Sequence, residues 1–138
     1  MDMLARGMQS QKIVVLPTLK IEDSLHVVIV TSRADGEWIL PKGNFETDLT
    51  NDEVAALEAW EEAGLRGLVK RSSETQIDLE IRKEPTRLTC LRMRVDEIAD
   101  SWPEDHQRER RIVRVRKAHD LLRKSGFSKI LDEMLPEV

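Results

Sequence analysis

The sequence predicts a mixed α/β fold. Short segments rich in Val and Ile occur near the start, a helix with clear end signals lies near the middle, and two helical segments close the chain. At 138 residues the chain suits a single domain over 1–138, with enough length to bury a hydrophobic core. A hydrophobic content of 40% argues against global disorder.

Two predicted strands and a shorter third one occupy the first part of the chain. They are QKIVVLPTLK (11–20), SLHVVIVTSR (24–33) and WIL (38–40). A polar segment separates the first two, and a turn leads into the third, which Pro41 ends. Pro17 predicts that the first strand is an edge strand or contains a bulge, because proline cannot donate a backbone hydrogen bond to a neighbouring strand.

A helix from about Asn51 to Ala63 is the best-marked element of the chain. Thr50, with Glu53 three residues later, forms a capping box at its start, and Gly64 provides a stop signal at its end. Helical spacing predicts one apolar face that packs in the core. That face consists of Ala56, Ala59, Trp60 and Ala63.

The second half of the chain predicts two further strands and two helices. The strands are IDLEIRKE (77–84) and RLTCLRMRV (87–95), which alternate apolar and polar residues around a turn at PTR (85–87). The helices are VRKAHDLLRK (115–124) and FSKILDEML (127–135), separated at Ser125-Gly126.

Three carboxylates gather on the face of the central helix opposite its apolar side. Glu58, Glu61 and Glu62 are related as i, i+3 and i+4, and no Lys or Arg lies at helical spacing to relieve their repulsion. Two of them lie in the last turn, where the helix dipole disfavours anions. Clustered carboxylates are the hard oxygen ligands that Mg²⁺ or Mn²⁺ requires. The pattern predicts a divalent-metal site, and a solvated acidic face is the alternative.

The spacing of these residues resembles the Nudix box, G-x5-E-x7-R-E-U-x-E-E-x-G-U, where U is a bulky aliphatic residue. Gly43, Glu58 and the segment 61–65 (EEAGL) match it in register. VIVTSR followed by WILPKG is similar to the branch that acts on diadenosine polyphosphates and diphosphoinositol polyphosphates. WPEDHQRERR followed by AHDLL is similar to small bacterial proteins of that branch. The resemblance extends from about Ile13 to Leu122.

The resemblance implies the Nudix fold, an α/β/α sandwich with a mixed sheet and a loop-helix-loop catalytic motif. It also implies a Mg²⁺-dependent (or Mn²⁺-dependent) pyrophosphohydrolase that cleaves a phosphoanhydride bond of a small polyphosphate. The substrate is then a nucleoside diphosphate-linked or polyphosphorylated molecule, of the dinucleoside polyphosphate or diphosphoinositol polyphosphate type. The family's specificity resides in loops outside the box, so the sequence does not name the substrate.

The same resemblance assigns roles to particular residues. Gly43 contributes its carbonyl to metal and lies in the substrate-binding loop, while Arg33 and Lys42 resemble phosphate-contacting cations. The expected metal-binding and catalytic carboxylates are Glu58, Glu61 and Glu62. The proton acceptor is left open among three residues: Glu58, or Glu104 or Glu109 in a later loop. Glu46 is a weaker metal-linked candidate, with an exposed loop carboxylate as the simpler interpretation.

The chain departs from the Nudix box at two polar positions. Leu49 replaces the first Glu and Leu57 replaces the Arg, while Ala59 stands where a larger aliphatic residue is usual. We expect the two leucines to bury each other, because an apolar contact can replace a polar network without stranding a charge. The alternative is a catalytically weak or inactive Nudix-fold module that binds a nucleotide in a regulatory role.

The remaining features of the sequence limit the partner and the location. The net charge of −4 selects no partner class, and no apolar run is long enough to cross a bilayer. A later basic group has two interpretations, a set of contacts to further phosphates or a solvated face. It consists of Arg108, Arg110, Arg111, Arg114, Arg116 and Lys117. Without Tyr or aromatic residues among these cations, nucleic acid is an unlikely partner, although an RNA 5′-end pyrophosphohydrolase is a third alternative.

Cysteine usage predicts a cytoplasmic protein. Cys90 is the single cysteine, which permits no internal disulfide and fits a reducing compartment. We interpret it as a buried core residue, and Trp38 and Trp60 likewise. The histidines show no metal-ligand spacing; they are His26, His106 and His119. The sequence indicates no oligomeric state.

Overall fold

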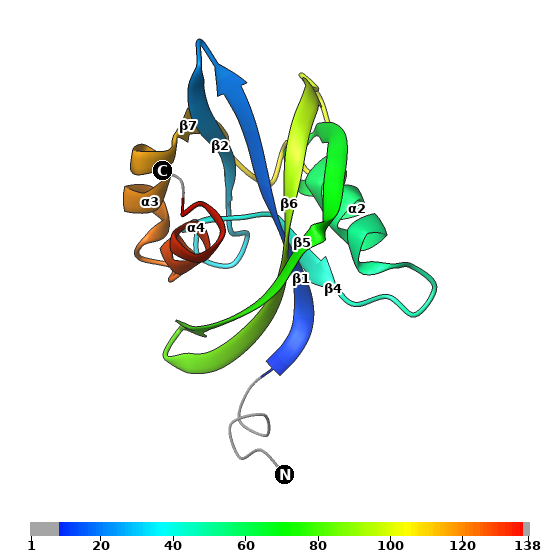
Figure 1. Cartoon of the computed structure of the whole chain (residues 1–138), viewed down its shortest axis with the longest axis vertical. Coiled ribbons are helices and arrows are strands. Elements are labelled where there is room, and N and C mark those ends of the chain that lie inside the picture. Colours follow the sequence, from blue (N-terminus) through cyan, green and yellow to red (C-terminus); the bar gives the residue numbers. More distant parts are fainter. Residues whose placement is uncertain (1–8, 137–138) are drawn as a thin grey trace.

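The structure, a computed structural model, describes residues 9–136, and within them a mixed sheet lies between helices on both sides (Figure 1). The strands are β1 (Gln9–Ile21), β2 (Ser24–Thr31), β3 (Trp38–Ile39), β4 (Lys42–Asn44), β5 (Leu65–Ile81), β6 (Glu84–Ile98) and β7 (Arg110–Arg114). The helices are α2 (Asn51–Ala63), α3 (Val115–Leu122) and α4 (Ser128–Met134). Helix α2 packs on one face of the sheet, with α3 and α4 on the other. The predicted α/β/α sandwich with a mixed sheet is confirmed.

Strand β1 lies in the middle of the sheet, so the edge position predicted from Pro17 is wrong. The strand does contain a register shift, but it lies between Gln9 and Lys12, away from Pro17. The sheet order is β3-β2-β1-β6-β5, with β4 also paired to β1 and β7 to β2, and only the β1–β6 pair is parallel within residues 9–136. Along one side, β1 pairs with β4 up to Val14 and with β2 from Thr18 onwards. Pro17 lies in the gap between these partners, where a missing N–H removes no ladder bond.

The hairpin formed by β5 and β6 is longer than the sequence predicts. Its first strand begins at Leu65, twelve residues before the predicted start. The sequence did not predict this early part of β5 because it is mostly exposed and shows no apolar alternation. The turn predicted at 85–87 is also wrong. Ile81 pairs with Glu84, and the turn lies at Arg82 and Lys83, which adopt positive φ angles of 53° and 67°.

Strand β7 was not predicted, because its sequence RRIVR reads as part of a basic group. It pairs antiparallel with β2, with Val113 opposite Val27. Its only buried residue is Val113, so the strand has almost no hydrophobic signal of its own. The predicted helices after it are confirmed as α3 and α4.

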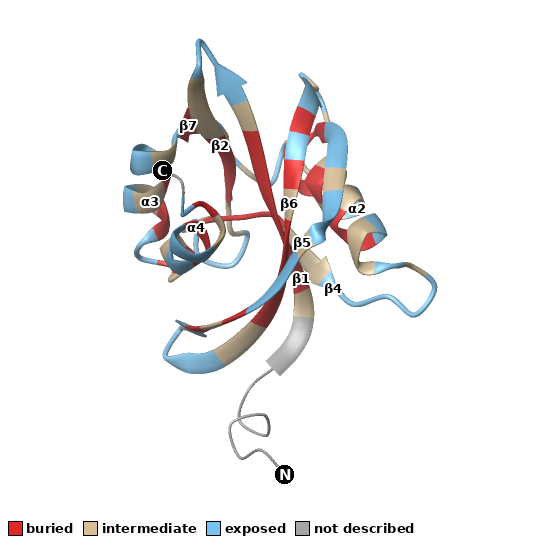
Figure 2. Cartoon of the chain, viewed as in Figure 1, coloured by how far each residue is buried: buried red, intermediate tan, exposed pale blue. Residues whose placement is uncertain are grey.

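The hydrophobic core fills both sides of the central strands (Figure 2). Residues 13–17 of β1 and 27–30 of β2 are buried without alternation, which is typical of strands that are covered on both faces. Cys90 is fully buried, and burial raises the pKa of its thiol to about 12, which confirms its interpretation as a core residue. Trp38 packs against the core as predicted. Within residues 9–136 no helix is both long and apolar enough to span a membrane.

The face of α2 that packs in the core is rotated about the helix axis relative to the predicted face. Ala59 and Ala63 are buried as expected, but Ala55 is buried in place of Ala56, which is half-buried. The small side chains at 55 and 59 let the helix lie close to the sheet. Trp60 is half-buried outside the core, and its ring packs under the guanidinium of Arg66 at 3.9 Å.

Candidate functional site

The N-terminal end of α2 is capped by its own sequence, as predicted. The Thr50 hydroxyl accepts a hydrogen bond from the Glu53 backbone N–H at 3.4 Å, and the Glu53 carboxylate accepts from the Thr50 N–H at 2.9 Å. The helix stops at Gly64, whose φ of 66° is in the left-handed region that glycine adopts without strain. These two signals place the helix between Asn51 and Ala63, as the sequence indicates.

The C-terminal end of α2 is held by residues from a distant loop. A helix leaves its last four carbonyls without intrahelical partners. Here the acceptors are the carbonyls of residues 60–63, and each receives a donor. The donors are the N–H of Gly64 (2.9 Å), the N–H of Glu104 (3.0 Å), the indole Nε1 of Trp102 (3.0 Å) and Nη1 of Arg110 (2.8 Å), respectively. The loop before β7 therefore clamps the acidic last turn.

Glu62 is buried at the centre of the site, which corrects the expectation that it lies on an exposed face. Its Oε1 accepts a hydrogen bond from the Lys42 backbone N–H at 3.1 Å. Its Oε2 lies 3.4 Å from Nη2 of Arg108, and both side chains are nearly buried, at 7% and 6% exposed. Burial raises the pKa of Glu62, while the positive charge of Arg108 acts in the opposite direction.

Glu58 lies against Gly43 and shares a hydrogen bond with Glu62. A Cβ atom added at Gly43 would lie 2.3 Å from Oε2 of Glu58, so only glycine leaves room for this carboxyl. Burial raises the pKa of Glu58 to about 8, and the neighbouring charges of Glu62 and Glu61 add to the effect. The protonated Glu58 donates to the Glu62 carboxylate, which is how two carboxyl groups share a confined space.

The three predicted carboxylates do not all converge. Within residues 9–136, no group of three or more His, Cys, Asp or Glu side chains is arranged to hold a metal ion. Glu58 and Glu62 meet, whereas Glu61 contributes its backbone carbonyl to the clamp and its charge to the surroundings of Glu58. The structure therefore assembles a carboxylate pair at the predicted place, with Glu61 beside it.

The candidate proton acceptors are placed differently by the structure. Glu104 lies at the site, where its Oε1 accepts from Nε of Arg108 at 2.8 Å, and its charge acts on both Glu58 and Glu62. Glu109 is exposed, and its backbone pairs with Thr31. Glu46 is an exposed loop residue, in line with the simpler interpretation of that carboxylate.

Cations line the cavity over the carboxylate pair. The cavity has a volume of about 200 Å³, and its lining includes Arg33, Lys42, Glu62 and Arg108. Burial lowers the pKa of Lys42. Arg33 is 57% exposed and hydrogen-bonds Gln107 at 2.9 Å. A second cavity of about 360 Å³ shares Lys42 with the first, and the further cations lining it are Arg82 and Lys124.

The predicted burial of Leu49 against Leu57 is wrong for Leu57. Leu49 is half-buried and packs against the hydrophobic core, but Leu57 is 38% exposed. Position 57 follows the buried pair Val54 and Ala55 and turns away from the sheet. Ionic contacts at the box come instead from Arg108, which binds both Glu62 and Glu104.

Sequence reasoning missed the roles of Trp102, Arg108 and Arg110. All three lie more than 38 residues beyond the helix that they hold, so no local spacing connects them to it. One signal did point to them. The last turn of α2 contains two glutamates and no basic residue, and such a turn needs donors and cations from elsewhere in the fold.

Comparisons with known proteins agree with the fold and the box. Nudix hydrolase 12, mitochondrial, of Arabidopsis thaliana is 31% identical over 121 residues, which are 82% of this chain and 60% of that protein. Nudix hydrolase 13, mitochondrial, of the same plant is 28% identical over 128 residues, or 86% of this chain and 63% of that protein. The chain thus spans somewhat less than two thirds of the length of these curated relatives. No family model matches the chain.

Solved structures show the same fold at low sequence identity. A C. elegans Ap4A hydrolase binary complex has a TM-score of 0.68 at 13% identity, covering 94% of this chain and 99% of that one. The NUDIX domain of Shewanella oneidensis NrtR complexed with ADP ribose has a TM-score of 0.73 at 13% identity, covering 99% of this chain and 92% of that one. The fold and the box define a Nudix-type protein. The chain belongs to the Nudix superfamily.

Proposed function

We propose that the chain is a Mg²⁺-dependent (or Mn²⁺-dependent) pyrophosphohydrolase that cleaves a phosphoanhydride bond of a small polyphosphate. The observation that carries the proposal is the carboxylate pair, in which Glu58 lies against Gly43 and Glu62 lines a cavity that is also lined by cations. A carboxylate pair beside phosphate-binding cations suits phosphoryl transfer, which needs mainly positioning and charge stabilisation.

The donor set fits a divalent metal. Glu58 and Glu62 are hard oxygen ligands, and in their present arrangement a single proton offsets their repulsion. A divalent cation would replace that proton, held by the two carboxylates together with Glu61 and the carbonyl of Gly43. When bound, the metal supplies charge neutralisation for the polyphosphate and lowers the pKa of a water molecule.

The chain's own residues would bind the phosphates and move the proton. Arg33 and Lys42 face the cavity and offer charge-assisted hydrogen bonds to phosphate oxygens. Arg108 holds Glu62 and Glu104 in place through its two ionic contacts. The proton acceptor is Glu58 or Glu104, because both lie at the site, whereas Glu109 does not.

The second cavity suits the group that remains attached to the phosphates. It adjoins the first through Lys42 and adds Arg82 and Lys124. These two cations now pair with Asp35 at 3.0 Å and Glu37 at 4.0 Å in the same lining, so further anionic groups of a ligand would compete with two carboxylates for them. A dinucleoside polyphosphate or a diphosphoinositol polyphosphate should therefore be a better substrate than a nucleoside triphosphate. Charge-assisted contacts accumulate with phosphate number and weaken as salt rises.

The alternative function is a Nudix-fold module that binds a nucleotide with little or no hydrolysis. It rests on Leu57, which is exposed at the box position where the family has an arginine. Arg108 weakens this alternative, because it gives the buried carboxylate of Glu62 an ionic partner although position 57 holds no arginine.

A Mg²⁺-dependent hydrolysis panel, read by chromatographic separation of the nucleotide and phosphate products, tests the proposal. It covers dinucleoside polyphosphates, diphosphoinositol polyphosphates, nucleoside triphosphates and triphosphorylated RNA. We expect Glu58→Gln and Glu62→Gln to lower turnover by at least about a hundredfold, because each removes a charged ligand from the metal site. Glu109→Gln is the matched control and should keep the parent rate, whereas a large loss in Glu104→Gln would identify the proton acceptor.

The panel also separates the two functions. Parent-like rates in Glu58→Gln and Glu62→Gln would remove the carboxylate pair from the active site. Tight binding of a panel member by the parent protein without hydrolysis would favour the binding module. A preference for a nucleoside triphosphate that does not respond to salt would contradict the role given to the second cavity.

The pH dependence of thermal stability provides a test without turnover. In the metal-free protein the folded-state pKa of Glu58, about 8, lies above its ordinary value of 4.5, so the folded state binds the extra proton between these two values. This contribution is present at low pH and is lost as the pH rises through about 8. We therefore expect stabilisation by added Mg²⁺, measured as the rise in Tm, to increase with pH up to about 8. A rise in Tm that is constant over this range would contradict the site.

The same proposal includes a location and a partner class. We propose one Nudix domain over 1–138, a cytoplasmic location and a small-molecule polyphosphate partner, with neither membrane nor nucleic acid. The single buried cysteine supports a reducing compartment. The curated Arabidopsis relatives carry "mitochondrial" in their names, so fractionation of cells that express the chain is the direct test.

A further inference from the structure

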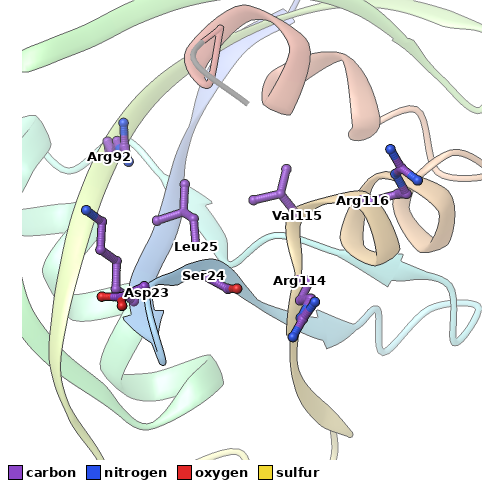
Figure 3. A pocket seen from close by; sticks show the side chains of 8 residues that line it. Asp23, Ser24, Leu25, Arg92, Arg114, Val115 and Arg116 are labelled. Carbon is purple, nitrogen blue, oxygen red and sulfur yellow. The ribbon is translucent and has the colours of Figure 1, made fainter.

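A separate cavity of about 570 Å³ lies between the β1–β2 hairpin and the start of α3 (Figure 3). Figure 3 shows two apolar side chains near its centre, with charged side chains on both sides. The residues that matter for its chemistry are Lys20, Asp23, Leu25, Arg92, Arg114 and Val115. These residues come from β1, β2, β6, β7 and α3, so the cavity exists only in the folded chain.

This cavity lies at the opposite end of β2 from the carboxylate pair. The cavity is lined by Ser24 and Leu25 at the start of the strand. Arg108, the partner of Glu62, donates to the carbonyl of Thr31 at the other end. Seven residue steps along a strand correspond to roughly 23 Å. A ligand in this cavity would therefore not touch the carboxylate pair.

Positive charge dominates the walls of the cavity. Four cationic side chains line it against one carboxylate, Asp23. Lys20, Arg114 and Arg116 form no ion pair with any other residue in the range 9–136. Arg92 contributes a fourth positive charge and contacts Thr18 through Nε at 3.4 Å. Unpaired cations around a hollow attract an anion of matching size.

The first turn of α3 forms part of the same wall. Arg114 occupies the N-cap position, and no side chain caps the helix there. The first N–H groups of a helix have no intrahelical partner and carry partial positive charge. Val115 and Arg116, at the first two helical positions, both line the cavity. Cationic side chains and free backbone donors together are the chemistry that binds a phosphate group.

The centre of the cavity is apolar. Leu25 and Val115 are both half-buried and face the same space (Figure 3). An inorganic ion would leave these side chains in contact with water, whereas a ligand with an apolar group would cover them. The lining contains no aromatic residue that could stack on a nucleobase.

We propose that this cavity is a second binding site, for a small organic phosphate whose phosphate group contacts the cations and the start of α3 while its apolar group covers Leu25 and Val115. The site is metal-independent and separate from the carboxylate pair. Its occupancy does not depend on the proposed hydrolysis.

The test uses the full chain in EDTA and follows backbone amide shifts by NMR. Phenyl phosphate and inorganic phosphate are the two probes, because they share a phosphate and differ by an apolar ring. We expect shifts at residues 24–25 and 114–116, with phenyl phosphate binding at least about threefold more tightly because its ring covers the apolar centre. In Lys20→Glu/Arg116→Glu, the Kd for phenyl phosphate should rise at least about fivefold.

The matched control is Lys83→Glu/Lys129→Glu, which reverses two exposed cations outside the cavity lining and outside α3 and changes the net charge equally. This variant should keep Kd within about twofold of the parent value, because only long-range charge is altered. Mg²⁺-dependent hydrolysis should be unchanged in both double variants. Three outcomes would each overturn the proposal. They are equal losses of affinity in the two double variants, amide shifts confined to residues around Glu62, and equal affinity for phenyl phosphate and inorganic phosphate.

Discussion

The two ends of helix α2 are stabilised in different ways. At the N-terminal end, Thr50 and Glu53 satisfy each other's backbone groups within four residues of sequence. At the C-terminal end, the acceptors are satisfied by a loop about forty residues further along the chain, through Trp102 and Arg110. The first arrangement is local, and the second exists only when the sheet has brought β7 beside β2.

The difference explains why the acidic residues lie where a helix disfavours them. Glu61 and Glu62 occupy the last turn, against the helix dipole, with no basic residue in that turn. Arg108 and Arg110 bring the positive charge from the distant loop. A turn stabilised in this way keeps the carboxyl groups of Glu58 and Glu62 together, whereas a locally neutralised turn would pair each of them with a neighbouring cation.

The largest expected effect comes from removing the buried cation at the C-terminal end. Arg108→Ala leaves the buried carboxylate of Glu62 without its partner. Loss of one member of a buried ion pair costs about 3–5 kcal/mol. We expect the free energy of unfolding, measured by urea denaturation, to fall by that order.

The matched control for this variant is Arg33→Ala. Arg33 is 57% exposed and lies 4.0 Å from Glu104, and such exposed pairs contribute about 1 kcal/mol or less. If Arg108→Ala were no more destabilising than Arg33→Ala, the C-terminal end would not depend on its distant cation.

A smaller effect is expected from Trp102→Phe. The indole Nε1 donates to the Glu62 carbonyl at 3.0 Å, while the ring stacks on Arg110 at 4.0 Å. Phenylalanine keeps the stacking and loses the donor, which should lower the free energy of unfolding by about 1–2 kcal/mol, because the carbonyl loses its hydrogen bond. Trp38→Phe is the control, since Trp38 stacks with Arg111 at 5.9 Å and has no hydrogen bond from its indole within residues 9–136. Similar losses in both variants would attribute the effect to ring size.

The smallest effect is expected at the locally capped end. Thr50→Ala removes the N-cap hydroxyl and should cost about 1 kcal/mol in urea denaturation. Thr50→Asp should recover most of that loss, because Asp is a good N-cap residue. Thr47→Ala, in the exposed loop before the helix, is the control and should be neutral. A cost at Thr50 as large as that of Arg108→Ala would erase the difference between the two ends.

Sequence patterns predicted those elements whose signals lie close together in the chain. Helix α2 begins and ends where its capping box and its glycine indicate. The Nudix-box resemblance assigned Gly43 and Glu58 to one site, and the structure brings them together, where a Cβ at position 43 would clash with the carboxylate. The first half of β5 and all of β7 were missed, because their residues are largely exposed and lack an apolar alternation.

The errors at α2 have a common physical cause. Helical spacing defines the angle between residues but not which angle faces the sheet. The packing of small side chains at 55 and 59 decides that rotation, and it buries Glu62 while leaving Leu57 and Trp60 partly in solvent. The burial predicted for Leu57 failed for this reason, whereas Leu49 packs against the core.

The sequence by itself determined the Nudix box, the limits of α2 and the clustering of carboxylates on that helix, because those depend on local spacing and side-chain chemistry. Only the tertiary structure decided which carboxylates meet, which cation faces them and which of the later basic residues belong to the site. Arg108 lies beside Glu62, while Arg114 and Arg116 line a cavity at the other end of β2. Antiparallel pairing of β7 with β2 separates these arginines by the length of a strand, which no pattern within the basic segment indicates.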